Sequence, residues 1–125
     1  MTSEELLAEA RRLVARPNAA TAGVWPRTAA LLARQALELA LDGLWGVRPQ
    51  TAGLAAASMR SQLLCLTAYL GEDAAARAAY LFAALSRACH YHCYELAPTA
   101  AELDRWLSET ADLVRLLHGS AGRGP

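Results

Sequence analysis

The sequence contains no lysine, although it has twelve arginines and twelve acidic residues, so its formal net charge is zero. The charges are spread along the chain, and no segment forms a basic tail. A balanced chain of this kind does not predict binding to duplex DNA, which requires many cationic contacts with phosphates. The use of arginine without lysine, together with an excess of alanine, is typical of a GC-rich bacterial genome.

The sequence also lacks long apolar runs and has few cysteines. No run approaches about 18 uninterrupted apolar residues, so we expect no transmembrane span and no membrane partner. Glu4 and Glu5 stand where a secretory signal would have a basic region before an apolar block. The three cysteines, Cys65, Cys89 and Cys93, are few and odd in number, which is consistent with a reducing compartment. These absences favour a cytoplasmic protein.

Apolar residues recur at helical spacing over most of the chain, and no stretch predicts a strand. The expected helices cover residues 3–16, 26–45, 55–70, 72–95 and 100–118. Pro17, Gly71 and Pro98 mark three of the boundaries. The second stretch is apolar over most of its circumference, which predicts a central position. We therefore expect an all-α, up-and-down bundle of about five helices, formed as one domain by residues 1–118 and followed by a disordered tail at residues 119–125.

Residues 85–96 concentrate the side chains that carry chemistry. They contain two of the three histidines, two of the three cysteines and two of the four tyrosines. On an ideal helix, basic and aromatic side chains form a stripe opposite the apolar one. The stripe consists of Tyr80, Arg87, His90, Tyr91 and Tyr94. Such a stripe can stack unpaired bases and contact phosphate, form a protein interface, or be a solvated surface, and the pattern leaves these three interpretations open.

Arg87 and His92 have R-x4-H spacing late in the penultimate expected helix. Together with the run Ala-Arg-Gln-Ala-Leu-Glu-Leu-Ala-Leu-Asp at residues 33–42, this pattern resembles the HEPN family (higher eukaryotes and prokaryotes nucleotide-binding domains) over roughly residues 1–118. The resemblance implies a small bacterial HEPN-like domain. Many members of the family are metal-independent endoribonucleases, often toxins or antiphage effectors, and they act as dimers whose motif residues line a shared cleft.

By that resemblance, Arg87 would hold the scissile phosphate of single-stranded RNA, and His92 would move a proton to or from the 2′-hydroxyl or the leaving oxygen. On an ideal helix His92 lies about 140° from Arg87, whereas His90 shares the face of Arg87 and is an alternative imidazole. Tyr91 and Tyr94 are the candidate RNA-binding residues.

The resemblance also implies a homodimer, no metal or other cofactor, and an antitoxin or effector protein as a possible partner. The alternative hypothesis is a noncatalytic HEPN-like dimerisation or interaction subunit of a larger defence or regulatory assembly.

Other chemistries are less well supported by the spacing. Three soft ligands share one helical face and a fourth lies elsewhere, as a zinc site would require: Cys89, His92, Cys93 and Cys65. No C-x2-C pair exists, and a cysteine on an apolar stripe is more typical of a core. A cysteine nucleophile would need an accessible thiolate, but Cys89 is expected to face the core. Glu38 and Asp42 share a polar strip, which could assist a site or be a solvated face.

Overall fold

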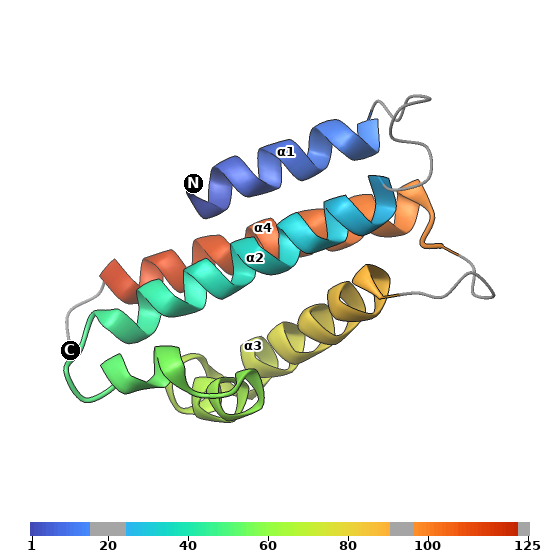
Figure 1. The fold of residues 1–125 in the computed structure, drawn as a ribbon. Helices are drawn as coiled ribbons and strands as arrows, with labels where there is room; N and C mark the ends of the chain where they lie inside the picture. Colours follow the sequence, from blue (N-terminus) through green and yellow to red (C-terminus); the bar gives the residue numbers. More distant parts are fainter. Residues whose placement is uncertain (16–24, 91–96, 123–125) are drawn as a thin grey trace.

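The computed structural model describes residues 1–15, 25–90 and 97–122, and these residues form helices and no strand. The elements are α1 (Ser3–Ala15), α2 (Trp25–Gly46), the short 3-10 helix η1 (Ala52–Ala56), α3 (Met59–Cys89) and α4 (Ala100–Gly122). Successive α-helices run in alternate directions, so the prediction of an all-α bundle is confirmed (Figure 1). Within these residues, no helix combines the length and apolar character needed to cross a bilayer.

Helix α2 is the centre of the bundle, as its apolar circumference predicted. It packs against α1, α3, α4 and η1. Five of its alanines are at most 1% exposed: Ala29, Ala30, Ala33, Ala36 and Ala40. Leu37, Leu41 and Leu44 are buried beside them. Because an alanine side chain is a single methyl group, the neighbouring helices can approach the α2 backbone closely.

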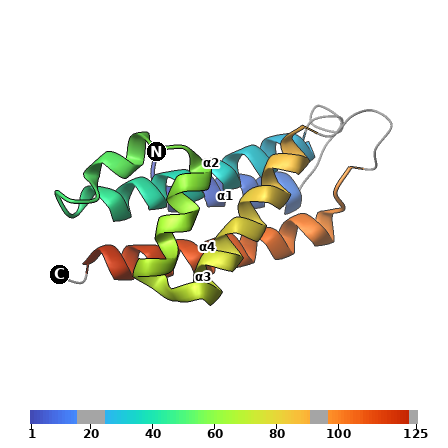
Figure 2. The same cartoon turned by 90° about the horizontal axis from the view of Figure 1, so that it is seen from below.

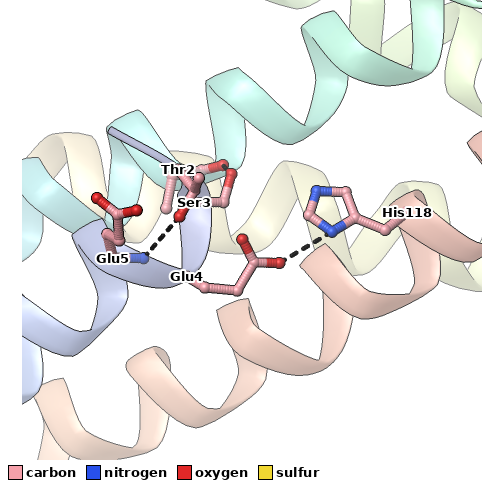
Figure 3. Close-up of polar contacts among 6 residues, drawn as sticks. Thr2, Ser3, Glu4, Glu5 and His118 are labelled. Atoms are coloured by element: carbon pink, nitrogen blue, oxygen red, sulfur yellow. Dashed lines mark hydrogen bonds and ion pairs between the residues drawn. The ribbon is translucent and has the colours of Figure 1, made fainter.

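The first turn of α1 is fixed by polar contacts with two other helices. The buried hydroxyl of Ser3 donates a hydrogen bond of 2.8 Å to a carbonyl of α2. The N–H of Glu5 donates to the hydroxyl of Thr2 at 3.1 Å, which caps the helix (Figure 3). Nδ1 of His118 in α4 lies 3.0 Å from a carboxylate oxygen of Glu4 (Figure 3). The start of the chain is therefore attached to both α2 and α4.

Helix α3 changes direction at Gly71, where two helices were predicted. Gly71 has φ +88° and ψ 170°, a backbone conformation that essentially only glycine adopts. A Cβ built there would meet nothing within 4 Å, so the backbone and not crowding requires glycine. This one residue divides α3 into a first arm (residues 59–70) and a second arm (residues 72–89) without a connecting loop (Figure 2). The described chain therefore has four α-helices rather than five.

The start of α3 also differs from the prediction. The chain forms η1 where the third helix was expected to begin, and α3 starts only at Met59. Ser58 is the N-cap of α3, and its hydroxyl accepts a hydrogen bond of 3.2 Å from the N–H of Ser61. The run of alanines at residues 55–57 satisfies helical periodicity equally well on either side of this cap, so composition alone placed the boundary too early.

Two helix ends differ from the prediction in opposite directions. Helix α3 ends at Cys89, because His90 has non-helical angles (φ −124°, ψ 21°), whereas the sequence predicted a helix to residue 95. Helix α4 continues to Gly122, so residues 119–122 of the expected disordered tail are helical. Residues 123–125 lie outside the described part of the chain. Glycine in a last exposed turn costs only about 1 kcal/mol relative to alanine, which explains why it did not end α4.

A cluster of hydrogen bonds joins α2, η1 and α3, and we call it the Trp45 corner (Trp45, Thr51, Gln62 and Tyr69). Trp45 is fully buried, and its Nε1–H donates to the side-chain carbonyl of Gln62 at 3.0 Å. The hydroxyl of Thr51 donates to the Trp45 carbonyl at 2.7 Å. The ring of Tyr69 meets the indole edge-on, with 5.6 Å between the ring centroids. These contacts anchor the first arm of α3 on α2.

Candidate functional site

A pocket of about 410 Å³ lies between the second arm of α3 and the start of α4. Its walls include Tyr80, Ala84 and Arg87 from α3, and Pro98, Glu102 and Trp106 from α4 and the residues just before it. We call it the Arg87 pocket. Two helices contribute to its walls, because α3 ends and α4 begins at the same end of the bundle (Figure 1).

Arg87 stands in the last turn of α3 with an exposed side chain. Within residues 1–15, 25–90 and 97–122, no hydrogen bond or ion pair engages its guanidinium group. Its N–H donors can therefore bind an anionic group such as a carboxylate or a phosphate.

His90 is exposed and follows the last residue of α3. Its backbone N–H donates a hydrogen bond of 3.1 Å to the carbonyl of Arg87, which closes the last turn. The 140° separation between Arg87 and His92 was calculated for an ideal helix that continues to residue 92, whereas α3 ends at Cys89. His92 itself lies outside the described residues, as do Tyr91, Cys93 and Tyr94.

The α4 side of the pocket is held by reciprocal capping bonds. The N–H of Thr99 donates to a carboxylate oxygen of Glu102 at 3.1 Å, and the N–H of Glu102 donates to the hydroxyl of Thr99 at 3.0 Å. These two hydrogen bonds form a capping box. Since Glu102 also lines the pocket, its negative charge stands in the same cavity as the positive charge of Arg87.

Two aromatic side chains form another part of the pocket wall. Trp106 is 9% exposed, and its Nε1–H lies 3.4 Å from the hydroxyl oxygen of Tyr80. Tyr80 is 54% exposed, so its ring is open to a ligand or a partner. Tyr80, Arg87 and His90 are all exposed, as the predicted stripe required. A guanidinium group beside aromatic rings can hold a phosphate while the rings stack on a base.

Arg34, Glu38 and Cys89 form a second group of polar side chains, which lies outside the Arg87 pocket. Arg34 and Glu38 of α2 form an ion pair, with 3.3 Å between the charged atoms. Burial raises the pKa of the Cys89 thiol, while Arg34 opposes this shift and Glu38 adds to it. The ion pair therefore acts on Cys89 and does not line the Arg87 pocket. A raised pKa keeps the thiol protonated and does not favour Cys89 as a nucleophile.

The remaining predicted candidates are not brought into this pocket. Asp42 is exposed on α2, and Cys65 is half-buried in the first arm of α3. Among the residues that the structure describes, no three His, Cys, Asp or Glu side chains are placed to hold a metal ion. The zinc hypothesis involved His92 and Cys93, which lie outside that set.

Sequence reasoning did not place Trp106 or Pro98 in a site. Pro98 was predicted only as a helix boundary, which agrees with the structure, and Trp106 is a core residue at 9% exposure. The available signal was the short connection between two consecutive helices. Such a connection makes the helices antiparallel neighbours, so residues near the end of one face residues near the start of the next.

Comparison of the chain with models of protein families, with curated proteins and with solved structures finds no match. The similarity to HEPN domains therefore stays a prediction from residue spacing. A function for this protein has to be argued from the chemistry of the Arg87 pocket.

Proposed function

We propose that the protein is a metal-independent endoribonuclease of HEPN type, which binds single-stranded RNA in the Arg87 pocket. The observation that carries the proposal is the position of Arg87, which lines a pocket with Tyr80 and Trp106. Its planar donors match the oxygens of a phosphodiester. The exposed ring of Tyr80 offers a stacking surface to an unpaired base of any sequence.

In the proposed reaction, Arg87 holds the scissile phosphate and an imidazole moves the proton. The 2′-oxygen of the ribose attacks phosphorus, its proton passes to a base, and the bond to the 5′-oxygen breaks as that oxygen receives a proton. His92 or His90 serves this transfer, because an imidazole nitrogen can accept a proton and give it back. The proposed active form is a homodimer whose cleft contains motif residues from both copies.

The test is cleavage of labelled single-stranded RNA in EDTA. We expect the wild type to cleave it and to leave the DNA of the same sequence intact, because DNA lacks the 2′-hydroxyl. Arg87→Ala should lower the cleavage rate at least about 100-fold, and comparison of His90→Ala with His92→Ala should identify the working imidazole. Arg11→Ala, an exposed arginine on α1, is the matched control. Absence of cleavage by the wild type, or equal rates for Arg87→Ala and Arg11→Ala, would reject the proposal.

A second candidate function is a noncatalytic interaction subunit of a larger assembly. The observation that favours it is the balanced charge of the pocket, in which Glu102 accompanies Arg87. A polyanion gains less from such a site than a protein partner, whose interface commonly buries tyrosine and arginine. Under this hypothesis the wild type cleaves no RNA, and Tyr80→Ala weakens binding to the partner assembly in pull-down experiments.

A further inference from the structure

The turn at Gly71 leaves an apolar groove between the two arms of α3, which diverge in Figure 2. The groove has a volume of about 570 Å³, larger than the 410 Å³ of the Arg87 pocket. Its apolar walls include Met59, Leu63 and Leu64 from the first arm and Ala75, Ala79 and Phe82 from the second. We call it the elbow groove.

The elbow groove combines a protruding side chain with a surface of small ones. Leu64 is 70% exposed, although it is a leucine in the middle of a helix arm. The second arm contributes alanines to the groove, namely Ala75, Ala76, Ala79 and Ala83. Small side chains leave space that a large apolar side chain from another molecule can fill. One element of the chain thus carries both the protrusion and the space that would receive it.

The groove also contains one charged residue of each sign. Arg60 from the first arm and Glu72 from the second arm both line it, and both are exposed. A two-fold symmetric interface uses the same surface on both copies, so that surface must be complementary to itself in shape and in charge. One positive and one negative group satisfy this condition, whereas a groove of one sign would repel its own copy.

We propose that the elbow groove is a self-association surface, which a second copy of this chain occupies. Leu64 of each copy enters the groove of the other, and Arg60 of one copy faces the partner's Glu72. The interface lies next to the Arg87 pocket without filling it, because Ala83 lines both cavities. This inference rests on the homodimer of the proposed function and assigns the surface that forms it. RNA cleavage and oligomeric state are measured separately, so a dimer that cleaves no RNA rejects the nuclease and leaves the self-association surface standing.

The first test is the oligomeric state of the full chain, measured by sedimentation velocity over the micromolar range. We expect a dimer, and we expect Leu64→Glu to raise the dissociation constant at least about 100-fold, since two leucines lose their burial. Leu39→Glu is the matched control, because Leu39 is a 43% exposed leucine on α2, outside the groove. Circular dichroism should show an unchanged helix content for both variants.

The second test reverses the charges. Arg60→Glu and Glu72→Arg should each weaken the dimer about tenfold by placing like charges opposite one another, and the double variant should restore it. A wild type that stays monomeric, or a dimer that survives Leu64→Glu, would overturn the proposal. Binding of a different protein in the groove of a monomeric wild type would overturn it as well.

Discussion

The two ends of the bundle use polar side chains in different ways. At the Trp45 corner, the indole N–H of Trp45 and the side chain of Gln62 are buried and hydrogen bonded to each other. At the opposite end of the bundle, where α3 ends and α4 begins (Figure 1), Arg87 is exposed and lines a pocket, and His90 is exposed. The comparison teaches that polar groups with protein partners hold the fold together, whereas polar groups facing solvent at a pocket are free to bind something else.

The difference has an energetic basis. A buried donor or acceptor that loses its partner lowers the free energy of unfolding by about 1–3 kcal/mol, because it has lost its hydrogen bonds to water on folding and has no replacement. An exposed arginine keeps its water, so its removal leaves the folded state nearly unchanged. The stability of variants at the two ends therefore distinguishes a structural cluster from a functional one.

The largest expected effect is at the buried end. Trp45→Ala should lower the free energy of unfolding by about 3–5 kcal/mol, because it removes a fully buried side chain and leaves a cavity. Arg87→Ala should change it by no more than about 0.5 kcal/mol. Urea denaturation followed by circular dichroism measures both. Equal losses at the two positions would mean that Arg87 has a structural role.

A double-mutant cycle isolates the hydrogen bond within that effect. Gln62→Leu should cost about 1–3 kcal/mol, because it leaves the indole N–H of Trp45 buried without an acceptor. In a chain that already carries Trp45→Phe, the same change should cost less, since no N–H remains. Additive losses would show that the hydrogen bond contributes little to the corner.

A loss of stability smaller than that of Trp45→Ala is expected at Gly71, in the middle of the helix α3 that connects the two ends. Gly71→Ala should lower the free energy of unfolding by about 1–3 kcal/mol, because alanine cannot adopt φ +88° without strain. Gly43→Ala is the control, since Gly43 lies within α2 and a Cβ there also meets nothing. This change should raise stability by about 0.5–1 kcal/mol. Thermal unfolding of the two variants would show whether backbone conformation alone sets the turn.

The smallest expected effect is a pH dependence from Cys89, near the pocket. Burial raises the pKa of this thiol, so the folded state binds more protons than the unfolded state as pH rises. The corresponding stability is complete below the ordinary pKa of a thiol and is lost as pH rises through the higher pKa of the folded state. Urea unfolding between neutral and alkaline pH should show a smaller decline for Cys89→Ala than for the wild type.

Much of the fold could be predicted from the sequence, because it depends on local patterns. Apolar spacing predicted the helical elements and the central position of α2, and Pro98 predicted the boundary before α4. The Trp45–Gln62 bond could not be predicted in this way, since it joins residues 17 positions apart. Nor could the end of α3 at Cys89, because residues 90–95 contain no helix breaker.

The candidate site was predictable only in part. The helical wheel placed Tyr80, Arg87 and His90 on an exposed face, and the structure agrees. It did not predict that Trp106 and Glu102 complete a pocket with Arg87, because a wheel describes one helix at a time. The RNA-binding role of Tyr91 and Tyr94 and the catalytic role of Arg87, His90 and His92 stay predictions.

The buried alanines of α2 have a consequence for how this sequence can evolve. Alanine has no rotamers to lose on folding, so burying these residues has no side-chain entropy cost. A longer side chain at Ala33 or Ala36 would be fully buried and could not reach solvent, so a neighbouring helix would have to shift to accommodate it. Substitutions at these positions are therefore restricted by size before they are restricted by polarity.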